Sequence, residues 1–171
     1  GLDHSGPLPL ERQSAVRFNQ NQPLGSLDDI LGATIALDAS AGHGTGGRAI
    51  AGLGVSSPVI VERWHGASYR KPATAMRECV TIMRQLFTEG RAKFAGEIYT
   101  ADFRLGFRMT QKRPPKIYLA GLNAPMLRLA GEVADGVLMN YSPPEAISPM
   151  VKLIHEGAAK AGRNPSEIDI A

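Results

Sequence analysis

The sequence predicts an α/β fold in which short parallel strands alternate with amphipathic helices. Short apolar runs, each ending at glycine or a polar residue, alternate with longer segments whose apolar residues recur every three or four positions. Proline stands at the start of the helical segments, and glycine ends the clearest of them. The resulting β-α-β-α-β-α-β order implies parallel strands with right-handed crossovers, and it predicts ligand binding at the carboxyl ends of the strands.

Composition is that of a soluble globular domain. The chain has 171 residues, of which 43% are hydrophobic and 20% charged, and its net charge of +3 does not by itself indicate a nucleic-acid partner. No apolar run approaches the roughly 20 residues that span a bilayer, and the start of the sequence lacks a signal-peptide pattern, so we expect a cytoplasmic protein without a membrane partner. Cys79 is the only cysteine, which excludes an internal disulfide and leaves no thiol pair for a metal.

The N-terminal region divides into an arm and the start of the folded domain. Residues 1–26 are polar and turn-rich, which predicts a loosely ordered arm before a domain at residues 27–171. A helix capped by Ser26 is expected to run to about residue 39. The glycine cluster that follows lacks the Lys-Ser/Thr ending of a phosphate-binding P-loop and precedes a strand, so a flexible turn with an exposed His43 is the better interpretation.

The first predicted strand, residues 49–53, ends at a loop of small residues formed by Gly54, Val55, Ser56 and Ser57. Backbone amides in such a loop could bind an oxyanion such as a phosphate, because glycine lets the chain approach a ligand closely. The spacing is only an incomplete dinucleotide fingerprint with no acidic ribose partner downstream. From the spacing alone, a plain turn after a buried strand is the preferred alternative.

The segment at residues 59–66 contains the only tryptophan, Trp64, followed by His65. Trp64 has two open interpretations, because it could wall a ring-binding pocket or anchor the loop to the core. His65 could hydrogen-bond a ligand, but a surface loop histidine is the commoner case.

The remaining elements alternate as the fold class requires. In chain order they are a helix at 72–90, an irregular segment or hairpin at 93–107 turning at Gly96, a strand within 116–123, a helix from Pro125 to about 133, a strand at 135–140, a helix from Pro144 to near Gly162, and a strand at 166–171. Parallel strands place three polar ends on one rim, namely residues 54–57, Gly121 to Asn123, and 140–142.

Charged residues in the second half carry weaker signals. The stretch from Arg104 to Arg128 contains no acid, which fits a solvated basic loop better than a polyanion site. Glu132 and Asp135 lie between a helix and a strand, where a structural role is expected.

Several motifs resemble one known family. Gly-Leu-Gly-Val-Ser-Ser-Pro (52–58), Glu-Arg-Trp-His-Gly (62–66), Ile-Tyr-Leu-Ala (117–120) and, above all, residues 126–140 resemble the luciferase-like monooxygenase superfamily. Within it, the likeness is greatest to deazaflavin-dependent oxidoreductases related to methylenetetrahydromethanopterin reductase, over residues 46–171. The resemblance implies a (β/α)8 barrel that binds coenzyme F-420 or flavin mononucleotide (FMN) at its rim.

The resemblance also assigns candidate cofactor contacts. It implies that the loop of Gly54, Val55, Ser56 and Ser57 holds the cofactor phosphate. Three other rim positions complete the candidate set, and these are Trp64, Gly121 and Asn123.

Only part of the barrel matches. A complete barrel needs about 250 residues, whereas the match runs from the helix before the fifth strand to the start of the eighth. We therefore expect a partial barrel of about four parallel βα units, completed by a homo-oligomer or a partner chain, and no catalytic or metal-binding residue can be assigned. The expected function is a flavin- or deazaflavin-dependent oxidoreductase acting on a small molecule. The alternatives are a non-catalytic cofactor-binding or structural protein and a fragment of such an enzyme.

Overall fold

The computed structural model describes residues 50–105 and 114–171. The arm predicted at 1–26, the helix ending near 39 and the glycine cluster with His43 lie outside the described residues.

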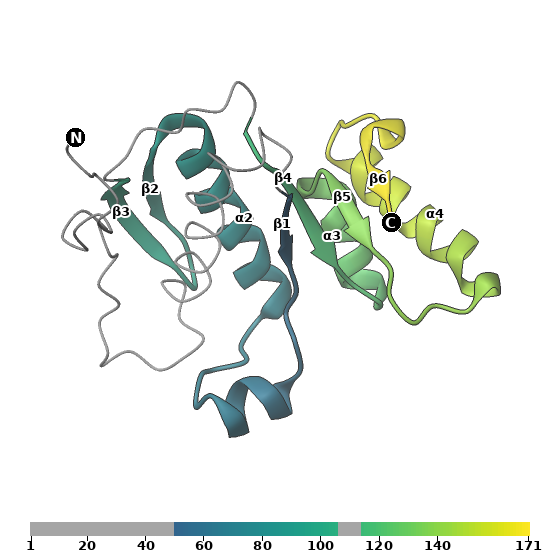
Figure 1. The fold of residues 1–171 in the computed structure, drawn as a ribbon, viewed down its shortest axis with the longest axis horizontal. Helices are drawn as coiled ribbons and strands as arrows, with labels where there is room; N and C mark the ends of the chain where they lie inside the picture. Colours follow the sequence, from purple (N-terminus) through teal and green to yellow (C-terminus); the bar gives the residue numbers. More distant parts are fainter. Residues whose placement is uncertain (1–49, 106–113) are drawn as a thin grey trace, which may run out of the picture.

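A four-stranded parallel sheet forms the centre of the molecule (Figure 1). Its strands run in the order β1-β4-β5-β6, and all three neighbouring pairs are parallel. Consecutive strands of the sheet are therefore spatial neighbours, as in consecutive βα units of a barrel. The strands are β1 at Ile50–Leu53, β4 at Lys116–Ala120, β5 at Gly136–Leu138 and β6 at Asp169–Ile170.

The helices follow the predicted order, with two short additions. The added elements are single turns that the sequence did not predict, one after β1 and one before β6. Pro72 begins α2, and Gly90 ends it in a left-handed conformation with φ of 65°, as the pattern indicated. The helical elements are η2 at Val59–Trp64, α2 at Pro72–Glu89, α3 at Ala124–Val133, α4 at Pro144–Lys160 and η3 at Pro165–Glu167.

The segment after α2 is a regular hairpin. Strands β2 (Arg91–Ala95) and β3 (Thr100–Arg104) pair antiparallel and form a sheet of their own beside α2 (Figure 1). Gly96 lies in the connection, as predicted, while residues 106–107 of the predicted segment lie outside the described part.

The two sides of the parallel sheet differ in burial. Alternate residues on one side, including Leu53, Ile117 and Val137, are buried against the helices. On the other side Ile50 is 54% exposed and Leu138 is 37% exposed. In a closed barrel that second side faces the interior, so the described chain presents the side that a complete barrel would cover.

Helices α3 and α4 touch through their backbones at two glycines. A Cβ atom added to Gly131 would overlap the carbonyl oxygen of Ile154, and one added to Gly157 would overlap the carbonyl oxygen of Arg128. Only glycine allows this close approach, and it fixes the position of α4 against α3.

Glu132 and Asp135 both have structural partners, which agrees with their expected role. Glu132 pairs with Arg77, at 2.6 Å between Oε2 and Nη2. Asp135 accepts one hydrogen bond from the amide of Ile117 and another from Arg84, each at 2.7 Å. These bonds join α2 to the start of β4 and to the turn before β5.

Candidate functional site

A pocket of about 450 Å³ lies beside the carboxyl end of β1. Buried side chains, among them Leu53, Met76 and Cys79, form its floor. The mouth of the pocket is polar and carries Ser56, His65, Ser68, Tyr69 and Arg70.

The loop after β1 forms one wall of the mouth. Ser56 has a φ of 56°, a left-handed conformation that is uncommon for a residue with a side chain and that requires support from its surroundings. The hydroxyl of Ser57 accepts a 3.4 Å hydrogen bond from the amide of Ile60, and its carbonyl accepts one from Val61. Among the residues that the structure describes, none accepts a hydrogen bond from the amides of Val55, Ser56 or Ser57. Val55 and Ser56, which line the pocket, thus carry backbone donors without a described partner.

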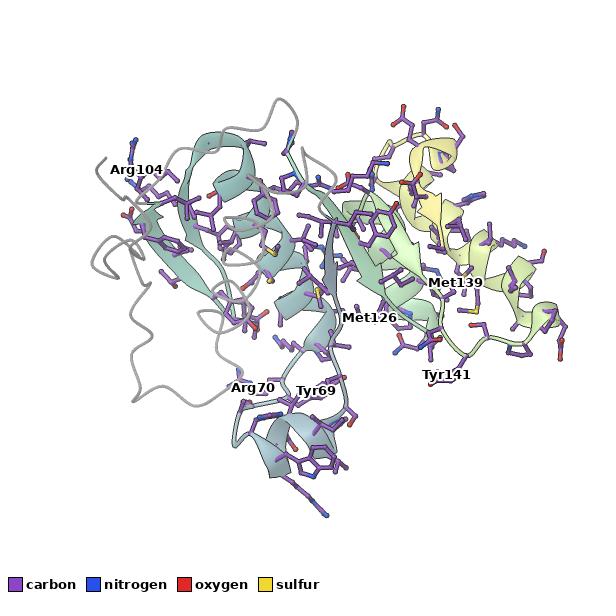
Figure 2. The ribbon with its side chains drawn as sticks, viewed as in Figure 1. Tyr69, Arg70, Arg104, Met126, Met139 and Tyr141 are labelled. Carbon is purple, nitrogen blue, oxygen red and sulfur yellow. The ribbon has the colours of Figure 1, made fainter. Side chains whose placement is uncertain are left out.

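The segment before α2 forms the facing wall. The hydroxyl of Tyr69 donates a long hydrogen bond of 3.4 Å to the carbonyl of Ser56, and the amide of Tyr69 donates to Glu62 at 3.3 Å. Figure 2 shows Tyr69 and Arg70 together at the end of this segment, next to η2.

Basic side chains, and no carboxylates, are among the described residues that line the mouth. Arg70 and His65 line it, and no aspartate or glutamate is among the described residues that line the pocket. Helix α2 begins here with no acidic residue in its first turn and with no side-chain cap from Lys71. A pocket mouth that carries an arginine and no described carboxylate favours an anionic ligand.

The floor contains a thiol that is not a nucleophile. Burial raises the pKa of Cys79 to about 12, so the thiol stays protonated near neutral pH. Cys79 is therefore the small core residue that the sequence indicated, although it also contacts the pocket.

Glu78 holds the hairpin against the pocket. Its buried carboxylate accepts hydrogen bonds from the amides of Glu97 (2.7 Å), Ile98 (3.0 Å) and Tyr99 (2.8 Å). Burial alone would raise the pKa of Glu78, but the three backbone donors outweigh it and the pKa lies below the ordinary glutamate value. The ion is stable because its donors replace water, and it keeps Tyr99 in the pocket wall.

A second polar cluster lies at the other end of the sheet. The carboxylate of Asp169 accepts hydrogen bonds from Lys116 and from the hydroxyl of Tyr118, each at 2.5 Å. The bond from Lys116 and then that from Tyr118 lower the pKa of Asp169. The cluster joins the first residue of β4 to β6, away from the carboxyl ends where ligands bind in such sheets.

The structure brings together only some of the predicted site residues. Gly54, Val55 and Ser56 line the pocket, whereas Ser57 lies behind them as the partner of η2. Trp64 is 71% exposed and does not line the pocket. Its role as a ring wall stays a prediction.

The candidates at the end of β4 also lie outside the pocket. Asn123 caps α3 by accepting a 3.0 Å hydrogen bond from the amide of Met126. Gly121 packs closely against Met126, where an added Cβ would lie 3.0 Å from that side chain. Their assignment as cofactor contacts stays a prediction.

Sequence reasoning missed Ser68, Tyr69, Arg70 and Tyr99. The first three lie just before Lys71 and Pro72, where α2 begins. In a βα unit the helix begins near the rim at which the preceding strand ends, so these residues lie near the end of β1. Polar and aromatic residues at that point are the signal that could have found them. Tyr99 had no local signal, because Glu78 brings it to the pocket from the hairpin.

Successive parallel βα units, with a pocket beside the carboxyl end of a strand, define part of a (β/α)8-type barrel. The chain belongs to the luciferase-like monooxygenase family, which matches residues 37–171. This confirms the resemblance recognised in the motifs.

The relatives carry reductase names. The chain is 41% identical over 127 residues to a 5,10-methylenetetrahydromethanopterin reductase of Archaeoglobus fulgidus, covering 73% of this chain and 37% of that protein. It is 37% identical over 164 residues to a protein of the same name from Methanolobus tindarius. That match covers 95% of this chain and 44% of the relative. The chain thus spans less than half the length of these relatives.

Two solved structures share the fold. The coenzyme F-420-dependent tetrahydromethanopterin reductase of Methanopyrus kandleri superposes with a TM-score of 0.62 at 30% identity, covering 74% of this chain and 40% of that one. An F-420-dependent secondary alcohol dehydrogenase superposes with a TM-score of 0.70 at 18% identity, and the match covers 83% of this chain and 44% of that one. At this identity the likeness supports the fold alone.

The described residues contain neither a candidate membrane span nor a candidate metal cluster. In residues 50–105 and 114–171 no helix is long and apolar enough to cross a membrane. The same residues contain no group of three or more His, Cys, Asp or Glu side chains that could hold a metal ion.

Proposed function

We propose that this chain binds coenzyme F-420 at the pocket beside β1 and serves an F-420-dependent oxidoreductase. The observation that carries the proposal is the loop Gly54 to Ser57, whose amides have no acceptor among the described residues and which borders a mouth without carboxylates. The reductase of Methanopyrus kandleri, named as dependent on this coenzyme, supports F-420 over FMN. FMN, which also carries a phosphate, stays the alternative cofactor.

The residues present fit the anionic end of such a cofactor. The amides of Val55 and Ser56 are the proposed donors to its phosphate, and the guanidinium of Arg70 adds positive charge at the same mouth. The bound deazaflavin would supply hydride transfer, while the chain positions one end of the molecule. We assign no catalytic residue.

We also propose that other polypeptide completes the barrel, either another copy of this chain or a partner chain. The support is geometric, because β1 and β6 are the outer strands of the sheet, and Ile50 of β1 and Leu138 of β5 are exposed on one side of it. Open edges and an exposed apolar sheet side favour association. Light scattering at micromolar concentration is expected to give a mass above that of the 18.2 kDa monomer. A single sharp monomer peak would contradict this proposal.

Titration with F-420 tests cofactor binding directly. We expect saturable changes in F-420 absorbance and fluorescence, and affinity at least about tenfold higher than for the deazaflavin core that lacks the phosphate-bearing chain, because charge-assisted hydrogen bonds contribute about 1.5–3 kcal/mol. Riboflavin and FMN provide the same comparison for the alternative cofactor. Absence of any spectral change with either cofactor would remove the basis of the proposal.

A non-catalytic cofactor-binding protein is the second candidate. The observation that favours it is the coverage of less than half of the relatives' length. Once binding is measured, turnover of reduced F-420 with a reducible acceptor separates the two candidates.

A further inference from the structure

We propose that strand β3 is a self-association edge, at which two copies of this chain pair antiparallel about a two-fold axis through Phe103. The inference goes beyond cofactor binding, because β3 does not line the pocket. It also concerns a different surface from the open side of the parallel sheet. Three observations carry it, namely the direction of the backbone groups of β3, the order of its charges and an exposed aromatic ring between them.

Hydrogen bonds at both ends of the hairpin fix which backbone groups of β3 point outward. Near the turn the amide of Gly96 donates to Tyr99, and at the open end the amide of Leu105 donates to Gly90, both in hydrogen-bonded pairs. Hydrogen-bonded and non-hydrogen-bonded pairs alternate along an antiparallel ladder, so every second residue of β3 directs its amide and carbonyl away from β2. These residues are Thr100, Asp102 and Arg104.

The two edges of the hairpin differ in how they are covered. On the β2 edge the amide of Lys93 points away from β3 and donates to the side chain of Gln85 in α2 at 2.9 Å. On the β3 edge, no described residue hydrogen-bonds to the outward amides and carbonyls. Figure 1 shows β3 as the strand of the hairpin further from α2. An exposed strand edge of this kind is a template for pairing with another strand.

The charges along β3 favour one register for two antiparallel copies. Asp102 and Arg104 are both exposed and both lie on the outward edge. Pairing about Phe103 puts Asp102 of each copy opposite Arg104 of the other, in hydrogen-bonded pairs that exchange both backbone bonds. Pairing about Asp102 or about Arg104 would instead put two like charges directly opposite each other, which is unfavourable. A two-fold interface has to be self-complementary, and the register about Phe103 meets that condition.

Arg104 lacks a carboxylate partner among the described residues. It stands directly opposite Arg91 in the hairpin, and like charges at such a pair are destabilising. Arg91 is paired with Asp102 at 3.1 Å, whereas no described carboxylate lies within salt-bridge distance of Arg104. Figure 2 shows Arg104 at the end of β3 that lies away from the turn. The aspartate of a second copy supplies the counter-charge that Arg104 lacks.

Phe103 lies at the proposed axis. Its side chain is on the α2-facing side of the hairpin, with Ala92 and Ala101, because side chains alternate along a strand. Both alanines are buried, but Phe103 is 37% exposed. In the register about Phe103 the two rings form a non-hydrogen-bonded cross-strand pair, where side chains approach most closely and aromatic pairs stabilise a sheet. The interface thus covers an aromatic ring that one copy leaves exposed.

Charge reversal tests the register. Asp102→Arg leaves two cations on the edge and Arg104→Asp leaves two anions, so each variant opposes like charges at both pairs. Analytical ultracentrifugation is expected to show that each weakens dimerisation by at least about tenfold. An equimolar mixture of the two variants should regain wild-type association, because both pairs again have opposite signs. Lys152→Asp, on the exposed side of α4, changes the net charge as Arg104→Asp does and should leave dimerisation unchanged.

A cysteine at the axis tests the geometry. The two Cα atoms of a non-hydrogen-bonded antiparallel pair lie about 4.5 Å apart, within the range that a disulfide spans. Phe103→Cys is therefore expected to form a covalent dimer on mild oxidation, and the native Cys79 does not compete because it is buried. Thr100→Cys is the matched control, because its two copies would lie about 20 Å apart and should not cross-link.

The outcomes separate this inference from the proposed function. Unchanged dimerisation in both charge variants, no recovery on mixing them, or equal cross-linking at positions 100 and 103 would each overturn the inference. A wild-type chain that is monomeric at every concentration would do the same. If the edge pairs as described but F-420 gives no spectral change, the interface stands and the cofactor proposal fails. If F-420 binds and the charge variants associate as the wild type does, the cofactor proposal stands and this interface fails.

Discussion

Gly131→Ala is expected to destabilise the protein by at least about 3 kcal/mol, enough to remove a large part of the stability of a typical domain. Two effects of opposite sign compete. Alanine is the better helix former by about 1 kcal/mol, which would stabilise α3. The added methyl group, however, would overlap the carbonyl oxygen of Ile154 in α4. Because the obstacle is backbone rather than a flexible side chain, the helices have to separate and the contact decides the sign.

Urea unfolding of Gly131→Ala, Gly157→Ala and the double variant measures this effect. Both single variants separate the same pair of helices, so the loss in the double variant should be smaller than their sum. Gly52→Ala is the control, because its new Cβ would lie at an ordinary 3.7 Å from Leu138. Stabilisation by Gly131→Ala would show that helix propensity dominates and that the two backbones are not in contact.

Glu78→Gln is expected to cost about 2–3 kcal/mol at neutral pH and to displace Tyr99 from the pocket wall. Glutamine has one acceptor oxygen for three amide donors, and its own amide group would face donors instead of acceptors. Unfolding in urea at pH 7 gives the free-energy difference. The exposed Glu89→Gln, at the end of the same helix, is the matched control and should change stability by less than about 0.5 kcal/mol.

The same carboxylate predicts a pH dependence. Because the pKa of Glu78 is lower in the folded protein than in the unfolded chain, its stabilising contribution is present above the unfolded value of about 4.3 and is lost as the pH falls through the folded value. The stability of the wild type should therefore fall more steeply with acidification below about pH 4.3 than that of Glu78→Gln. Parallel pH profiles for the two proteins would show that Glu78 does not contribute.

The candidate site was only partly readable from the sequence. The loop of Gly54, Val55 and Ser56 carries a local signal, since a strand that ends in small residues is visible in the sequence itself. Arg70 reaches the same pocket from beyond η2, and no spacing rule connects it to Ser56. Asn123 is the opposite case. It is a polar residue after a strand, as a ligand contact would be, but its side chain caps α3.

The sequence by itself determined the order and type of the strands of the parallel sheet and of the helices α2, α3 and α4. Apolar periodicity, proline at helix starts and the glycine after α2 act over a few neighbouring residues, so they can be recognised locally. Tertiary structure alone decided the contact of Gly131 with α4, the reach of Glu78 to the hairpin and the pairing of Tyr69 with Ser56. Each of these joins residues that are distant in sequence. Their energies depend on how whole elements pack, which local patterns do not encode.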